Sequence, residues 1–141
     1  LVGQGLPGAE VQALAAGDAS VRCVSRVVDV AAFLREVDVF VICSSHEAAP
    51  RVLLEAMACG RAIVATRVGG MVEMLHGRGD EPCGVLVEPG RPSDLAAALL
   101  QVAGDPQARA ELGARARARA ADFSADTEWR AWSRIYEALL P

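Results

Sequence analysis

The stretch from Phe40 to Gly60, FVICSSHEAAPRVLLEAMACG, determines the fold that we expect for this chain. Together with the preceding valine, it begins with the apolar run 39–43, which is typical of a strand buried on both faces of a parallel sheet. A short polar loop follows at 44–47. We then expect a helix whose first residue is Pro50, because a proline there needs no amide partner and already has a helical φ. A strand, loop and helix in this order indicate an α/β fold.

Two glutamates lie on either side of the predicted helix start. Glu47 ends the loop at the carboxyl end of the predicted strand, where open α/β sheets bind their ligands. Glu55 lies within the run 52–59, which is otherwise apolar and predicts a helix in the core. Because burying an unpaired charge costs several kcal/mol, we expect Glu55 to be paired or to bind a ligand. The two carboxylates could therefore serve one site.

The rest of the chain repeats this alternation. Further strands are expected at 21–24, 61–66 and 84–88, and Leu1-Val2 resembles the end of a strand that begins before Leu1. Helices are expected at 9–16, 30–37, 71–76, 94–103, 106–121 and 124–140, with N-caps at Asp29, Ser93, Asp105 and Ser124. Alternating strands and helices predict a Rossmann-like, mainly parallel sheet with helices on both faces.

Composition and charge are those of a globular protein of one domain. The 141 residues are 52% hydrophobic and 23% charged, and the net charge of −4 argues against a nucleic-acid partner. No apolar run reaches the length of about 18 residues that a membrane span needs. The four cysteines form no CxxC pair, so neither zinc nor a redox motif is indicated. We expect reduced thiols and a cytoplasmic protein.

Glu47, Glu55 and the residues AMACG that follow resemble the E-x7-E signature of the group 1 (family 4) retaining glycosyltransferases. The likeness covers essentially the whole chain, at LVGQG (1–5), VVDV (27–30), AIVAT (62–66), GGMVE (69–73) and GVLV (84–87). It implies that residues 1–141 form the nucleotide-sugar (donor) binding domain, the second, C-terminal domain of a GT-B type two-domain fold. It also implies that the first strand and helix of this domain, and the acceptor domain, are absent from the chain.

The resemblance implies transfer of a sugar from a nucleotide diphosphate sugar to an acceptor, with retention at the anomeric carbon. The resemblance assigns Glu47 to the donor sugar. Its neighbours Ala48 and Ala49, which are small enough to let a ligand approach, and His46, which adjoins it in the loop, are further sugar-binding candidates. The residues that the resemblance assigns to nucleotide or phosphate binding are Pro50, Arg51, Leu54, Glu55 and Val27. No residue is assigned as catalytic.

The implied chemistry needs no metal and no other cofactor. A helix start suits a diphosphate, because its free amides and its dipole favour anions. In the family, an Arg and a Lys that also bind the phosphates belong to the strand and helix before Leu1. The expected partners are the nucleotide sugar, an unidentified acceptor and the acceptor domain. The full-length protein could also associate peripherally with the inner face of the membrane.

Several features allow a second interpretation. Residues 3–8 match GxGxxG, but a dinucleotide site is disfavoured because Asp29 lies beyond the end of the second predicted strand. Asp29 fits a helix N-cap better than a nucleotide contact, and Glu73 fits a brace for its helix better than a substrate contact. A solvated helix face explains the basic residues near the C-terminus better than a phosphate site does: Arg115, Arg117 and Arg119.

Two other functions are also considered. A nucleotide-sugar epimerase of the same architecture would have a related donor pocket, although the E-x7-E-A-M-A spacing fits transferases better. A non-catalytic nucleotide-binding module is the third hypothesis. The last predicted helix places four large apolar residues on one face: Trp129, Trp132, Tyr136 and Leu139. This face either covers the core of the domain itself or serves another domain, as the resembled fold implies.

Overall fold

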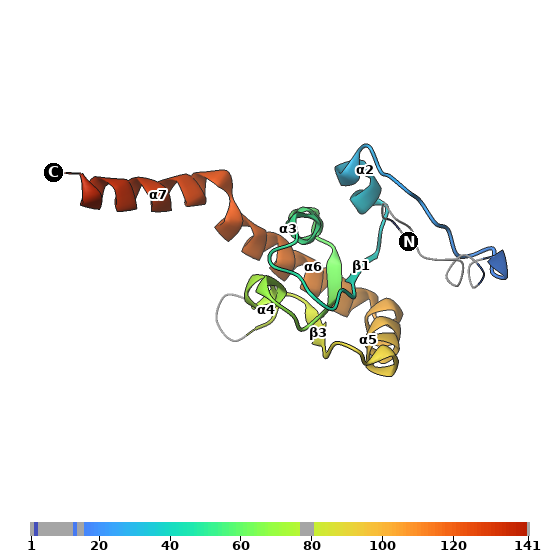
Figure 1. Cartoon of the computed structure of the whole chain (residues 1–141). Helices are drawn as coiled ribbons and strands as arrows, with labels where there is room; N and C mark the ends of the chain where they lie inside the picture. The colour runs from blue at the N-terminus through green and yellow to red at the C-terminus, as the bar shows by residue number, and fades with distance from the viewer. Residues whose placement is uncertain (1, 3–12, 14–15, 77–80, 141) are drawn as a thin grey trace.

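The computed structural model describes residues 2, 13, 16–76 and 81–140 of the chain. The GxGxxG stretch at 3–8 and most of the helix expected at 9–16 lie outside the described residues. Figure 1 shows the chain, in which the C-terminal helix α7 (Ala125–Leu139) extends away from the part that contains the sheet.

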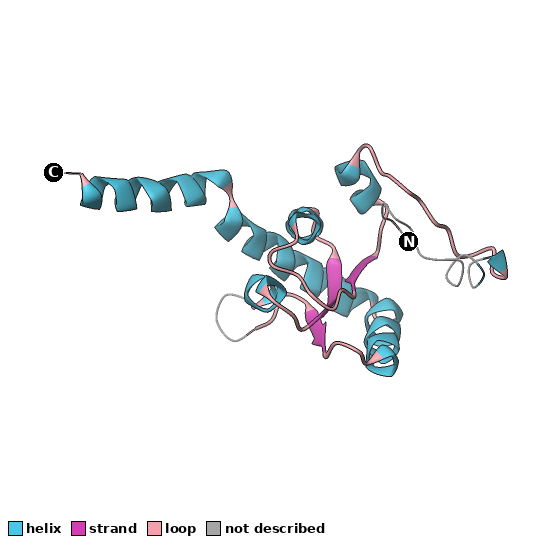
Figure 2. Ribbon diagram, viewed as in Figure 1, coloured by secondary structure: helices cyan, strands magenta, loops and turns pink. Residues whose placement is uncertain are grey.

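Three parallel strands form the centre of the domain, in the order β1-β2-β3. They are β1 (Val39–Ile42), β2 (Ala62–Thr66) and β3 (Val85–Val87). Val41 of β1 pairs with Val64 of β2, which in turn pairs with Val85 of β3. Helices follow or connect the strands (Figure 2): α2 (Val30–Arg35), α3 (Arg51–Ala58), α4 (Gly70–Leu75), α5 (Pro92–Gly104), α6 (Pro106–Ala120) and α7 (Ala125–Leu139). The predicted parallel α/β fold is confirmed.

Strand β2 carries the core on both of its faces. All five of its residues are buried. Ile63 and Ala65 pack in one cluster with residues of α3 and α4, whereas Ala62 and Val64 pack in a second cluster with Ala98 and Val102 of α5. Because alternate residues of a strand point to opposite faces, helices cover both faces of the sheet, as predicted.

Two sequence predictions were wrong: that β1 is buried on both faces, and that residues 21–24 form a strand. Strand β1 lies at one edge of the described sheet, and the side chain of Val41 is 39% exposed. Val24 forms only an isolated parallel bridge with Val2, and Val21 is exposed. A run of apolar residues is buried on both faces only where neighbouring strands and helices cover it, and that depends on residues far away in the sequence.

Three predicted helix caps are confirmed. Asp29 Oδ1 accepts a hydrogen bond of 2.9 Å from the amide of Ala32, Asp105 Oδ1 accepts one of 2.9 Å from Ala108, and Ser124 Oγ accepts one of 3.2 Å from Thr127. The caps satisfy amides that would otherwise have no partner. The prediction for α5 was wrong by two residues: this helix begins at Pro92 and its N-cap is Arg91 rather than Ser93.

The last helix packs very little of its surface. No residue of α7 is buried, and its large apolar residues are 48% to 74% exposed: Trp129, Trp132, Ile135, Tyr136 and Leu139. We call these five residues the aromatic stripe. The interpretation that this face covers the core of the domain is therefore wrong for the described chain, and its service to another domain stays a prediction. Among the described residues, no helix has the length and apolar character that crossing a membrane requires.

Candidate functional site

The loop between β1 and α3 holds the first predicted glutamate. Ser44 Oγ donates a hydrogen bond of 2.8 Å to Glu47 Oε1. The carbonyl oxygen of Ser44 accepts a 2.6 Å hydrogen bond from Oγ1 of Thr66, the last residue of β2. The amide of Gly70 donates one of 2.7 Å to the carbonyl oxygen of Ala48. The segment after β2 therefore fixes the site loop at several points.

Two glycines allow this close contact. Gly69 has a φ of +49°, and a Cβ atom there would overlap the Glu47 carbonyl oxygen and lie 2.8 Å from its carbon. A Cβ atom on Gly70 would overlap the carbonyl oxygen of Ala48. Since these neighbours are backbone atoms, no side-chain rotation could relieve the overlap. The GGMVE stretch is thus explained by the approach of its backbone to the Glu47 loop.

An open hollow lies beside Glu47. It has a volume of about 630 Å³, and its lining includes three of the four predicted sugar-binding residues: His46, Glu47 and Ala48. Ser45, Val68 and Gly69 complete the lining, and Ala49 is exposed but does not contribute to it. His46 is exposed, and its Nδ1 lies 3.1 Å from Ser45 Oγ. Glu47 is half-buried, so its carboxylate remains accessible from this hollow.

The start of α3 lies next to this loop and carries no side-chain cap. The helix begins at Arg51, one residue later than predicted, because Pro50 has an extended ψ of 119° and serves as the N-cap. A proline side chain has no atom that can accept a hydrogen bond, so no side-chain cap occupies the first amides of the helix. Arg51 is exposed at this end. The helix start can therefore offer amides and one guanidinium to an anion.

The prediction that Glu55 is buried was wrong. Leu53, Ala56 and Met57 form the buried face of α3, whereas Glu55 lies on the exposed face. No described residue forms an ion pair or a hydrogen bond with its carboxylate. The sequence pattern overestimated the apolar face because two of its apolar residues, Val52 and Ala58, are exposed to solvent. Glu55 is consequently free to bind a ligand and is not required to balance a buried charge.

Two further nucleotide-binding candidates, Leu54 and Val27, are both half-buried but lie in different parts of the domain. Leu54 is half-buried and packs against the core cluster of α3 and α4. Val27 is half-buried and precedes α2, which contacts α3, but it does not line the hollow beside Glu47. The cap made by Asp29 explains that residue without a ligand.

Of the features for which a structural role was preferred, Arg115 and Arg119 have partners within the domain, whereas no described residue forms a hydrogen bond or an ion pair with the carboxylate of Glu73. The side chain of Glu73 is exposed, and its backbone carbonyl oxygen accepts a 3.1 Å hydrogen bond from Arg119. Arg119 also forms a 3.0 Å ion pair with Asp122, and Arg115 forms one of 3.3 Å with Glu81. Two of the three basic residues near the C-terminus are therefore neutralised within the domain.

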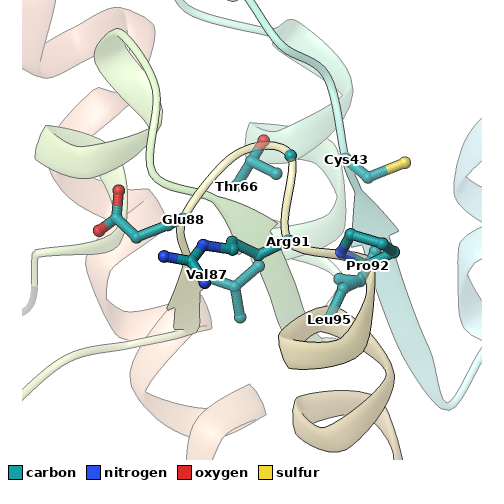
Figure 3. Close-up of a pocket in the computed structure, with 8 residues that line it drawn as sticks. Cys43, Thr66, Val87, Glu88, Arg91, Pro92 and Leu95 are labelled. Carbon is teal, nitrogen blue, oxygen red and sulfur yellow. The ribbon is translucent and has the colours of Figure 1, made fainter.

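Sequence reasoning missed a second cavity of about 250 Å³ at the carboxyl ends of all three strands. Its lining includes Cys43, Thr66 and Val87, which end or follow the strands, and Arg91 at the start of α5. In Figure 3 the loop 88–91 arches between the end of β3 and α5. Glu88 of this loop forms a 2.9 Å ion pair with Arg67. The signal for the cavity is the convergence of three strand ends, which requires the sheet order to be known.

Comparisons with known proteins define the class. The chain superimposes on sucrose-phosphate synthase from Thermosynechococcus elongatus with a TM-score of 0.80 and 27% identity, over 92% of this chain and 33% of that one. It superimposes on Anabaena HepE in complex with UDP-glucose with a TM-score of 0.78 and 26% identity, over 98% and 40% of the two chains. These neighbours are GT-B glycosyltransferases, so the domain has the fold of part of such an enzyme.

The family described as "Glycosyl transferases group 1" matches residues 1–105, and the chain belongs to this family. A curated relative, the D-inositol 3-phosphate glycosyltransferase of Paenarthrobacter aurescens, is 39% identical over 95 residues. That match covers 67% of this chain and only 22% of the relative. The matched residues of the family include both glutamates, the site loop and the two glycines.

Proposed function

We propose that this chain is the donor-binding half of a glycosyltransferase that moves a sugar from a nucleotide diphosphate sugar to an acceptor with retention of anomeric configuration. The observation that carries the proposal is the position of Glu47 and Glu55 on the two sides of an uncapped helix start, at the carboxyl end of β1. Open α/β sheets bind their ligands at this edge. The acceptor domain would be supplied outside residues 1–141.

Each candidate residue has a role that suits its position. Glu47 would accept hydrogen bonds from hydroxyls of the donor sugar, with His46, Ala48 and Ala49 beside it. Glu55 lies five residues after Pro50, about 7.5 Å along the helix axis. Its exposed carboxylate would hold the two ribose hydroxyls, because both of its oxygens accept and both hydroxyls donate.

The diphosphate would lie between these two carboxylates. The amides at the start of α3, beside Pro50, and the guanidinium of Arg51 would bind it. The same groups would stabilise the charge that develops on the departing phosphate, which is the electrostatic part of catalysis. We propose that this chemistry proceeds without a metal ion. Leu54 and Val27 would contribute to the nucleotide side of the site.

The known proteins support a nucleotide sugar as the ligand class. HepE has been crystallised with UDP-glucose and with UDP, so a UDP sugar is the first donor to test on this chain. None of the relatives reported above is named an epimerase, and no observation favours a non-catalytic module. All four cysteines are free thiols. We propose that the protein acts in the cytoplasm, where thiols remain reduced.

An NMR titration of the ¹⁵N-labelled chain would test the proposal, since it detects binding in the millimolar range. Nucleotide diphosphate sugars that differ in base would be added up to about 10 mM. We expect at least one of them to shift the amides of His46, Glu47, Arg51 and Val52 in a saturable manner. The absence of any saturable shift at these amides, or shifts confined to the 250 Å³ cavity, would contradict it.

A further inference from the structure

We propose that Ser44 and Thr66 are positioning residues that hold the Glu47 carboxylate in the orientation needed to bind the donor sugar. The inference rests on the proposed function and adds to it two residues that lie outside the set of expected ligand contacts. It is carried by two consecutive hydrogen bonds, from Thr66 Oγ1 to the Ser44 carbonyl oxygen and from Ser44 Oγ to Glu47 Oε1.

The bond from Ser44 leaves Glu47 able to bind a ligand. It engages Oε1 at 2.8 Å, and no described residue forms a hydrogen bond or an ion pair with Oε2. An ionised carboxylate has about four acceptor positions, so one oxygen can be held while the other accepts from sugar hydroxyls. A hydrogen bond to an ionised acceptor is also among the stronger ones. The carboxylate is thereby ordered before the sugar arrives, which lowers the entropy lost on binding.

Thr66 connects this arrangement to the core. It is the last residue of β2 and is only 4% exposed, and it is the one buried polar residue of the described chain. Its hydroxyl bonds the carbonyl oxygen of Ser44 at 2.6 Å, across 22 positions of sequence. A β-branched side chain in a buried strand has little rotamer freedom. Ser44 is therefore anchored to the fully buried central strand of the sheet.

The backbone of the loop has a separate support. The amide of Gly70 bonds the carbonyl oxygen of Ala48, and Gly69 packs against the carbonyl group of Glu47. These contacts do not involve the hydroxyl of Ser44. Removing that hydroxyl should consequently free the carboxylate of Glu47 while the loop backbone stays in place. This separation makes an effect on sugar binding distinguishable from a loss of structure.

The test compares the affinities of one nucleotide diphosphate and its sugar-bearing form for the wild-type chain and for Ser44→Ala. We expect Ser44→Ala to weaken binding of the nucleotide sugar about 3- to 10-fold and to leave that of the bare nucleotide diphosphate unchanged. Ser44→Thr keeps a hydroxyl and should restore the affinity. Thr66→Val should act in the same direction as Ser44→Ala, and Thr66→Ser should restore it.

Ser20→Ala is the matched control. Ser20 Oγ donates a 2.6 Å hydrogen bond to Asp18 Oδ1, so this variant also removes a bond between a serine and a carboxylate, but on an exposed segment outside the site. Ser44→Ala would overturn the proposal if it changed the sugar nucleotide affinity no more than Ser20→Ala does. Equal losses for both ligands would assign Ser44 to loop structure and would also overturn it.

Glu47→Ala separates this inference from the proposed function. If Glu47→Ala weakens only the sugar-bearing ligand and Ser44→Ala has no such effect, the positioning role is wrong and the function stands. If the wild-type chain binds neither ligand, both are wrong. Should Thr66→Val fail to fold, the comparison of Ser44→Ala with Ser44→Thr still decides the question, because Ser44 is only half-buried.

Discussion

Gly69→Ala should both destabilise the domain and impair the site. A Cβ atom at this position would overlap the Glu47 carbonyl group, whose carbon would be only 2.8 Å away. The backbone has φ +49° and ψ −141°, a conformation that costs a residue with a side chain roughly 1–3 kcal/mol. If the loop moves away, the bond between Gly70 and Ala48 is lost as well, at about 0.5–1.5 kcal/mol. The expected loss of unfolding free energy is therefore about 1.5–4.5 kcal/mol.

Denaturant unfolding and nucleotide-sugar titration of the same variant would measure both effects. Because small domains have roughly 5–15 kcal/mol of stability, Gly69→Ala should still fold, but with a displaced Glu47 and weaker sugar binding. Gly104→Ala is the control: Gly104 is the last residue of α5, and apart from its chain neighbours and the backbone of its own helix no atom lies within 4 Å of an added Cβ, so this variant should fold without strain. Stability and donor affinity of Gly69→Ala equal to those of the wild type would contradict the close contact between Gly69 and the Glu47 backbone.

Three further outcomes follow from contacts outside the site. Arg61 donates hydrogen bonds of 3.0 Å to the carbonyl oxygens of Val37 and Cys59. Arg61→Ala should therefore lower the unfolding free energy by about 1–3 kcal/mol, and Arg61→Lys should recover only part of this loss. Equal stability of the wild type and both variants in urea would contradict this prediction. Trp129 is 71% exposed, and exposed apolar patches tend to associate, so we expect the chain to self-associate through the aromatic stripe. Trp129→Glu should reduce this association in sedimentation without loss of stability, and unchanged association would argue against a role of the stripe. Burial raises the pKa of the Cys83 thiol, and the positive charge of Arg119 opposes this shift in part. The stability contributed by the neutral thiol should therefore be present below about pH 8.5 and decline above it. Iodoacetamide should modify the exposed Cys23 before the buried Cys83, and the reverse order would contradict the assigned burial.

Local sequence signals predicted those parts of the fold that depend on local chemistry. Asp29, Asp105 and Ser124 each cap a helix because a side-chain oxygen can reach the amide three residues ahead. The alternation of elements was sufficient to predict a parallel sheet, and β2 is as buried as its composition indicates. These features require no knowledge of distant residues.

Burial could not be predicted where it depends on what packs against an element. Val41 and Glu55 both lie in apolar runs, yet the first is on an edge strand and the second faces solvent. The aromatic stripe has a clear helical period, but the period cannot identify the surface that covers it. For Val41 and Glu55 the sequence predicted the element correctly and its environment wrongly, and for the aromatic stripe it left two environments open.

For the candidate site, sequence analysis predicted Glu47 and Glu55 from their spacing and their place after a strand. It did not predict that Thr66 supports Ser44, the hydrogen-bond donor to Glu47, because the bond from Thr66 to Ser44 joins positions 22 residues apart. The need for Gly69 was visible only as part of a family pattern, whereas the structure gives its cause in the approach to the Glu47 backbone. The roles of both glutamates in ligand binding remain predictions.

The central claim is that Glu55 binds the nucleotide and Glu47 binds the sugar. It is tested most directly by titrating Glu55→Ala and Glu47→Ala with one nucleotide diphosphate and its sugar-bearing form, with exposed Glu137→Ala as the matched control. We predict that Glu55→Ala weakens the binding of both ligands by about 1.5–3 kcal/mol, a loss of affinity of roughly 10- to 150-fold, without loss of stability. We predict that Glu47→Ala weakens the binding of the sugar-bearing ligand and leaves the binding of the bare nucleotide diphosphate unchanged. Unchanged binding of both ligands to Glu55→Ala, or equal losses of both ligands for Glu47→Ala, would contradict the account.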